Sequence, residues 1–222
     1  MAYTFGSISG TVRSPGAISD TWVGRSLAIG DRAVLAVFKS STETVTGITD
    51  SGSNTWTRIV TDVVASTERW SFFESAIVAA ATSITVTYSA ASTTNGPRFE
   101  LFQASGLNQS IAGQAVANYQ GTPTTATDAT TSTALTPAAQ PGVLVGYTFD
   151  DFAAVTNTGT GFTDRGVSAA DASVRWEDKS ISSTAAIAAT YTSANNYPHV
   201  TLAVYWQEAA SAATLSRVMY IG

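Results

Sequence analysis

The stretch His-Val-Thr-Leu-Ala-Val-Tyr-Trp at residues 199–206 carries an apolar side chain at every second position from Val200 to Trp206. Successive side chains of a β-strand point to opposite faces of the sheet, so this period of two predicts a strand with one buried face. Residues 84–88, Ile-Thr-Val-Thr-Tyr, repeat the pattern. We therefore expect both stretches to be half-buried strands.

The chain around these stretches consists of further strand signals and short turns. Residues 33–38 and 143–145 are continuous apolar runs, which are typical of strands covered on both faces in the middle of a packed sheet. The best helical candidate, residues 76–81, is short. Turn chemistry separates the strands at residues 50–54, 95–97, 140–142 and 195–198. The pattern predicts an all-β protein with a jelly-roll-like antiparallel β-sandwich.

An internal duplication adds to this prediction. Residues 49–58 match residues 156–165, and Arg69-Trp70 matches Arg175-Trp176. Two further matches follow in the same order along the chain: residues 87–90 with 190–193, and residues 97–102 with 198–203. The alternative explanation is that β proteins of this composition resemble themselves in many places.

We expect a single sandwich domain over residues 1–222, with half-repeats at about residues 25–107 and 141–208. Residues 108–140 would form a crossover with one or two edge strands, and residues 212–222 a C-terminal strand. Half a sandwich exposes one apolar sheet face, so the two halves are expected to close over one core.

Composition excludes several classes of protein. The eleven basic residues are scattered singly and the net charge is -5, which argues against a nucleic-acid partner. The absence of cysteine excludes disulfides, thiolate metal sites and a cysteine nucleophile. No apolar run approaches the roughly 18 residues needed to span a bilayer, and the first residues do not resemble a signal peptide. We expect a folded protein made in a cytoplasm, without membrane insertion.

Catalytic patterns are weak. The only histidine, His199, would have to serve any serine nucleophile, and we expect it at the surface or on an edge strand. The acidic pairs at residues 150–151 and 177–178 place their carboxylates on opposite faces if they lie on strands, and solvated loop charges are their ordinary explanation. Residues 50–54 are oxygen-rich, but a turn is favoured over a Ca²⁺ site. We predict no catalytic residue, no cofactor and no metal site.

Aromatic residues leave two interpretations open. Tryptophan faces can stack on sugars, but Trp70, Trp176 and Trp206 lie in strand patterns and are predicted to be core anchors. Apolar residues also continue toward both chain ends, and such ends suggest pairing with the sheet or with a neighbouring subunit. The predicted docking residues are Tyr3, Phe5, Leu215, Val218, Tyr220 and Ile221.

A resemblance to a known family rests on four segments. These are residues 30–37, 48–57, 84–87 and 99–106, which describe strands and turns rather than a site. The segments resemble β-sandwich proteins encoded among phage and prophage structural genes, of the decoration or tail-associated type. The resemblance covers mainly residues 25–107, implies a role in the virion, and carries over no catalytic residue.

Composition supports the same expectation independently. Ala, Ser and Thr make up 96 of the 222 residues, and lysine occurs only at Lys39 and Lys179. This composition is typical of proteins that act outside cells, and release by lysis would not need an export signal. We therefore predict a non-enzymatic virion protein, such as a capsid decoration, head-fibre or tail component. Its expected partners are other virion proteins and further copies of itself, with a surface glycan as an additional candidate. The alternatives are a carbohydrate-binding module and a polysaccharide-active enzyme domain.

Overall fold

The computed structural model describes residues 3–13, 15–39, 43–65, 68–91, 97–120, 129–138, 141–150, 155–167, 173–193 and 199–210. Every strand pair within these residues is antiparallel, and they contain no helix. The all-β antiparallel sandwich expected from the sequence is confirmed. The helical candidate is wrong, because Ala76 ends one strand, Ala81 begins the next, and a turn joins them.

The first nine strands lie between residues 4 and 105. They are β1 (Thr4–Val12), β2 (Ser19–Leu27), β3 (Arg32–Lys39), β4 (Val45–Asp50), β5 (Thr57–Arg58), β6 (Val63–Ala65), β7 (Glu68–Ala76), β8 (Ala81–Tyr88) and β9 (Arg98–Ser105). The remaining strands are β10 (Gln114–Gln120), β11 (Ala129–Thr131), β12 (Gly142–Asp150), β13 (Val155–Thr158), β14 (Thr163–Val167), β15 (Val174–Ile181), β16 (Thr190–Ser193) and β17 (His199–Gln207).

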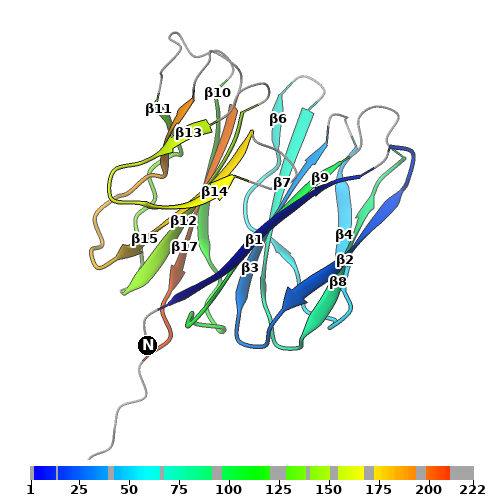
Figure 1. The fold of residues 1–222 in the computed structure, drawn as a ribbon, viewed down its shortest axis with the longest axis horizontal. Helices are drawn as coiled ribbons and strands as arrows, with labels where there is room; N and C mark the ends of the chain where they lie inside the picture. The colour runs from blue at the N-terminus through cyan, green and yellow to red at the C-terminus, as the bar shows by residue number, and fades with distance from the viewer. Residues whose placement is uncertain are drawn as a thin grey trace, which may run out of the picture.

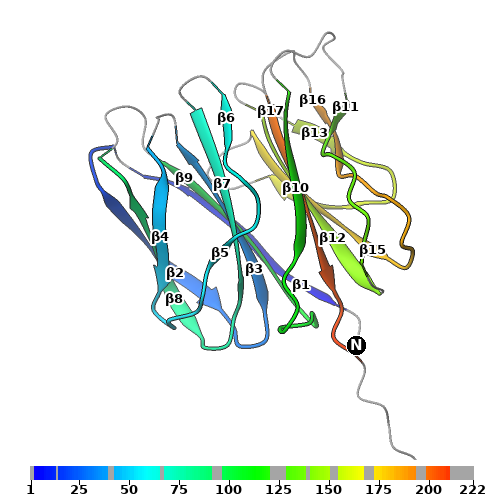
Figure 2. The same ribbon diagram turned by 180° about the vertical axis from the view of Figure 1, so that it is seen from behind.

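The strands form four sheets, which stack as layers in Figures 1 and 2. The first large sheet has the order β1-β9-β3-β7-β5, with β6 also on β7, and the second large sheet has the order β10-β17-β12-β15-β14. A first small sheet, β2-β8-β4, covers the first large sheet, and a second small sheet, β11-β16-β13, covers the second. The two large sheets pack face to face in the middle.

The two halves of the chain share one strand order. Strands β1, β9, β3, β7 and β5 correspond in order to β10, β17, β12, β15 and β14, and β2-β8-β4 corresponds to β11-β16-β13. The matching Arg-Trp pairs lie on β7 and β15, which hold the same place in this order. The shared order begins at β1 and β10, so it extends beyond the predicted half-repeat boundaries into residues 108–140. The predicted C-terminal strand at residues 212–222 lies outside the described residues.

The alternation within strands explains the layers. On β3, Val34, Ala36 and Phe38 face the core between the large sheets, while Ala33, Leu35 and Val37 face the first small sheet. Strand β8 is covered on one face only, as predicted, with Ile84 and Val86 fully buried and Thr87 exposed.

The prediction of one buried face is wrong for residues 199–206, because the second face of β17 also packs. Val200, Leu202, Val204 and Trp206 lie in the central core. Ala203 and Tyr205 on the other face lie in the core beneath the second small sheet. Residues from both halves therefore meet in one central core, and each half also has an outer core of its own.

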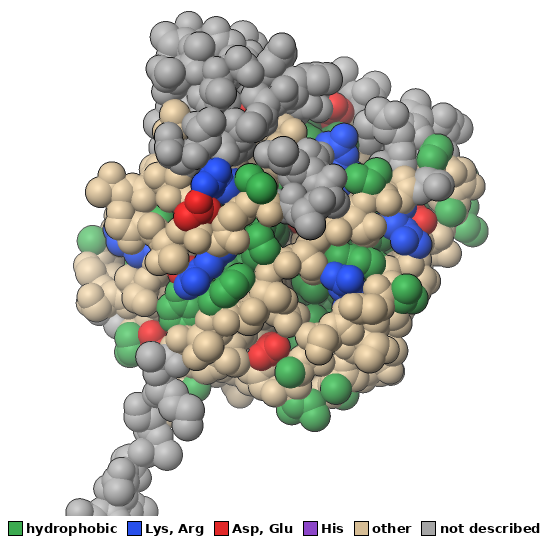
Figure 3. All heavy atoms as spheres, viewed as in Figure 1, with side chains coloured by type: hydrophobic (Ala, Val, Ile, Leu, Met, Phe, Trp, Pro, Cys, Tyr) green, Lys and Arg blue, Asp and Glu red, His purple; other side chains and the backbone are tan. Residues whose placement is uncertain are grey.

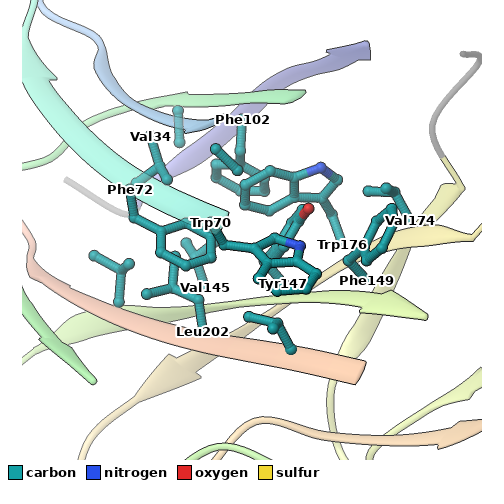
Figure 4. Close-up of a cluster of buried hydrophobic side chains, with 14 of the residues drawn as sticks. Val34, Trp70, Phe72, Phe102, Val145, Tyr147, Phe149, Val174, Trp176 and Leu202 are labelled. Carbon is teal, nitrogen blue, oxygen red and sulfur yellow. The ribbon is translucent and has the colours of Figure 1, made fainter. Parts of the chain in front are cut away.

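The predicted core anchors lie in the central core. Trp70, Trp176 and Trp206 are 1%, 0% and 1% exposed. Trp70 packs on Phe149 of the second large sheet, with ring centroids 5.8 Å apart, and Trp176 packs on Phe102 of the first at 5.5 Å. Figure 4 shows both indole rings among side chains from the two large sheets. Each tryptophan therefore contributes to holding the two halves together.

We predict that Trp70→Ala and Trp176→Ala each lower the free energy of unfolding by about 3 to 5 kcal/mol, because each removes a large buried ring and leaves a cavity. Urea denaturation at constant temperature measures the loss. Val23→Ala, at a site 66% exposed, is the control and should change it by less than about 0.5 kcal/mol. Unfolding midpoints equal to that of the parent would contradict the anchor role.

Candidate functional site

Three exposed apolar side chains lie at one end of the molecule, on three neighbouring turns. Ile29 is 70% exposed between β2 and β3, Val78 is 68% exposed between β7 and β8, and Ile111 is 49% exposed between β9 and β10. We call Ile29, Val78 and Ile111 the end surface. Hydrophobic atoms are visible at this lower end in Figure 3, over the turns β2–β3 and β7–β8.

Hydrogen bonds brace these turns against one another. The Gly30 amide donates to the carbonyl of Ile77 at 2.9 Å, and the Ile77 amide donates to that of Asp31 at 2.9 Å. The Gln109 side-chain amide donates to the Gly30 carbonyl at 2.9 Å. The turns that carry the end surface are thus held together by hydrogen bonds, so they have little conformational entropy left to lose when a partner binds.

A buried ion pair lies beneath the end surface. Arg32 and Glu74 are 3% and 4% exposed, and their Nη2 and Oε2 atoms are 3.0 Å apart. The other terminal nitrogen of Arg32 donates to the carbonyls of Asn108, at 2.7 Å, and Ile111. The arginine therefore fixes the backbone that carries Ile111.

Glu74 connects this pair to the second half of the chain. Its Oε2 accepts a hydrogen bond from the Trp206 indole at 2.8 Å, and its Oε1 accepts one from the Gly113 amide at 2.8 Å. A buried charge is tolerated when its partners satisfy it in this way. The ion pair thus joins the two large sheets and the end surface into one unit.

A cavity of about 290 Å³ opens beside the ion pair. Its lining combines hydroxyl, amide and small apolar groups: Arg32, Thr55, Thr57, Glu74, Ser75, Ala76, Val78, Gln109, Ser110 and Ala112. Among the described residues of this lining, Arg32 and Glu74 alone are charged, and their charges cancel. Two atoms of these residues, Arg32 Nε and Gln109 Oε1, are buried and have no hydrogen-bond partner within the described part of the chain.

The predicted docking residues of the N-terminus contact the second half of the chain. The Tyr3 hydroxyl donates to Asp178, and Arg165 lies over the Phe5 ring, 4.4 Å from its centroid. Burial, followed by the hydrogen bond to Asp178, raises the pKa of Tyr3 to about 12. Among the predicted anchors and docking residues that the structure describes, Trp206 contacts the ion pair, through Glu74. Leu215, Val218, Tyr220 and Ile221 lie outside the described residues.

The expectation of solvated charges and a surface histidine is wrong. Asp150, Glu177 and Asp178 are fully buried on strands. His199 is 2% exposed on β17, which lies between β10 and β12 and is not an edge strand. Both faces of β12 are covered along its whole length, as are those of β17 from residue 199 to 206, and the middle of β15 at residues 176–178 is buried too, so these side chains are withdrawn from water whatever their polarity.

The adjacent acids do point to opposite faces, as predicted. Asp178 pairs with Arg165 and Tyr3, whereas Glu177 accepts hydrogen bonds from the amides of Gly159 at 2.9 Å and Thr190 at 3.1 Å. Burial raises the pKa of Glu177 to about 7, although these two amides act to lower it. Glu177 thus links the second large sheet to the loop after β13 and to β16.

The oxygen-rich loop at residues 50–54 forms a turn. The Asp50 carboxylate accepts hydrogen bonds from the amides of Gly52 and Asn54 at 2.9 and 3.1 Å, and from the Trp56 indole at 2.8 Å. These donors occupy the oxygen atoms that a cation would need. Across the described residues, no three His, Cys, Asp or Glu side chains gather as a metal site would require.

Aromatic side chains do not form an exposed platform on the part of the surface that is described. The large hydrophobic side chains exposed there are Val12, Ile18, Val23, Ile29, Val64, Val78, Ile111 and Val167, none of them aromatic. Trp56 is half-buried and its indole nitrogen is bound to Asp50. The ring faces that sugar stacking uses are therefore largely covered in the described structure.

Sequence reasoning missed Arg32, Glu74 and Gln109. The available signal was a charged residue at the start of one apolar run, Arg32 before residues 33–38, and another inside a second, Glu74 after Phe72 and Phe73. Charges in strands that are otherwise apolar are seldom buried without a partner. Their pairing could not be read from sequence, because the two residues lie on different strands.

Comparisons of the chain with protein-family models, with curated proteins and with solved structures found no match. The described residues contain no helix that is long and apolar enough to cross a membrane.

We predict that Glu74→Ala lowers the free energy of unfolding by about 3 to 5 kcal/mol, because it leaves the Arg32 charge buried and unpaired. Urea denaturation measures the change, and Thr57→Ala, in the wall of the same cavity, serves as the control. A loss within about 1 kcal/mol of that control would show that Arg32 does not depend on Glu74.

We further predict that Glu177 makes stability fall as pH rises. The pKa of Glu177 is about 7 in the folded chain, above the usual value of 4.5. The contribution of the protonated carboxyl to the free energy of unfolding is therefore fully present below pH 4.5 and lost by about pH 7. Between those pH values the free energy of unfolding of the parent should fall by about 3 kcal/mol more than that of Glu177→Gln, since each pKa unit corresponds to about 1.4 kcal/mol. Denaturation curves at pH 4.5 and 7.5 test this, and equal losses in the two proteins would refute it.

Proposed function

We propose that this chain is a non-enzymatic structural protein that acts by docking to other proteins through its end surface. The observation that carries the proposal is the set of exposed apolar side chains on a braced frame, Ile29, Val78 and Ile111. Apolar side chains that gather on a rigid surface are typical of protein interaction sites.

The buried ionisable groups support a structural role. Arg32 and Glu74 join the two halves, as do Tyr3, Arg165 and Asp178, and Glu177 connects a large sheet to a small one. These contacts satisfy charges that would otherwise destabilise the interior. The role of such groups in holding layers together fits a protein whose task is to keep its shape.

The setting we propose is a phage particle, where the chain would be a capsid decoration, head-fibre or tail component with other virion proteins as partners. Support comes from the sequence resemblance over residues 25–107 and from the lysine-poor, cysteine-free composition. We also propose that the two halves are related jelly-roll-like repeats. Their shared strand order and the Arg-Trp pairs on β7 and β15 support this.

Carbohydrate binding is the second candidate, favoured by the hydroxyl groups of Thr55, Thr57, Ser75 and Ser110 around the cavity. None of the described residues that line the cavity is aromatic, so they offer no ring for a sugar to stack on. Protein docking therefore has the stronger support. Binding on a glycan array that is lost with Thr57→Ala would reverse this order.

We predict that mass spectrometry of virions purified from the source host finds this protein at a constant copy number. Val78→Asp should reduce its adsorption to particles that lack it at least tenfold, because a charge in the end surface must be desolvated on docking. Val23→Asp is the matched control, since residues 78 and 23 are 68% and 66% exposed. Virions without the protein would reject the phage setting, and equal adsorption of both variants would reject the end surface as the docking site.

A further inference from the structure

We propose that the end surface binds residues 211–222 of a second copy of this chain. The inference rests on the proposed function and names a partner for the same surface. Three observations carry it: the place where the described fold ends, the composition of residues 211–222, and their small number of turn-forming residues.

The described fold ends beside the loop that carries Ile111. The Glu208 and Ala209 amides donate to the carbonyls of Pro141 and Gly106, each at 2.9 Å. The Asn108 amide donates to the Gln207 carbonyl, also at 2.9 Å. In Figure 1, β17 ends at the same lower end of the molecule as the turns β2–β3 and β7–β8. The last described residues, 208–210, thus lie beside the loop that carries Ile111.

The composition of residues 211–222 complements that surface. Five of the residues are large and apolar, and Arg217 is the single charged side chain: Leu215, Val218, Met219, Tyr220 and Ile221 form the apolar set. The charges of the cavity beside the end surface cancel, so little is gained there by a strongly charged ligand. An apolar segment can instead bury itself against Ile29, Val78 and Ile111.

The small number of turn-forming residues favours a second copy over the same copy. Residues 209–221 contain no Gly, Pro, Asn or Asp, and Ser211 and Ser216 are the weaker turn formers among them. Fully extended, residues 211–222 would reach about 40 Å, enough to meet a neighbouring molecule. Because each copy would offer one surface and one segment, the contact is head-to-tail and can link copies in series or in a ring.

Analytical ultracentrifugation of the full chain tests the proposal. The parent should associate as its concentration rises. Val78→Asp, in the surface, and the double variant Val218→Asp/Ile221→Asp, in the segment, should each raise the dissociation constant at least tenfold. Val23→Asp should associate like the parent, and matching thermal melts would establish that all variants fold.

Mixing the two defective variants separates this mechanism from others. The Val78→Asp chain keeps an intact segment and the double variant keeps an intact surface, so the mixture should form 1:1 heterodimers that stop at two copies. A synthetic peptide of residues 211–222 should prevent these heterodimers from forming, because it competes for the intact end surface of the double variant. A parent that stays monomeric at all concentrations, or a mixture that stays monomeric, would overturn the proposal.

The outcomes also separate this inference from the proposed function. If self-association is absent while Val78→Asp still reduces adsorption to particles, the docking function holds and residues 211–222 are not the partner. If self-association follows the scheme but purified virions lack the protein, the head-to-tail contact holds and the phage setting falls.

Discussion

Burial of both faces of the two large sheets is the constraint on which the rest of the structure depends. Alternate residues of β3 and β17 face the central core, and the residues between them face an outer core. A sheet that is apolar on both faces needs cover on both, since each exposed large apolar side chain forgoes roughly 1.5 to 3 kcal/mol of burial. The two large sheets cover each other on one face, and a small sheet covers each of them on the other. The four layers follow from this requirement.

The same constraint explains why so many charges are buried. Strands in the middle of the stack have no face open to water, so Arg32, Glu74 and Glu177 must find partners inside the protein. The arrangement of these partners is specific, because a carboxylate with its hydrogen bonds satisfied fits only one relative position of the layers. Glu74 holds Arg32, the Gly113 amide and the Trp206 indole at once, and in doing so ties the two halves together below the end surface.

This arrangement also relates stability to function. The turns of the end surface belong to the first half and to the link between the halves, and the ion pair that fixes them depends on a residue of β17. A partner that binds the end surface therefore meets a rigid surface. Rigidity lowers the entropy lost on association, which suits a protein that works by docking.

Much of the fold could be predicted from the sequence. Strands were expected from the period of two at residues 84–88 and 199–206 and from the apolar runs at residues 33–38 and 143–145, and all four segments are strands. The adjacent acids of β15 also face opposite ways. Less of the candidate site could be read. Trp206 stood out as a core anchor, but nothing adjacent in sequence links it to Glu74, which lies 132 positions away.

By itself the sequence determined which side chains share a face of each strand, that the chain turns at residues 50–54, and that no cysteine chemistry is available. Only the tertiary structure decided what lies against each face: that β17 is covered on both sides, that His199 and Glu177 are buried, and that Arg32 meets Glu74. The physical reason is that side-chain alternation is a local property of an extended backbone, whereas burial and charge pairing depend on strands brought together from distant parts of the chain.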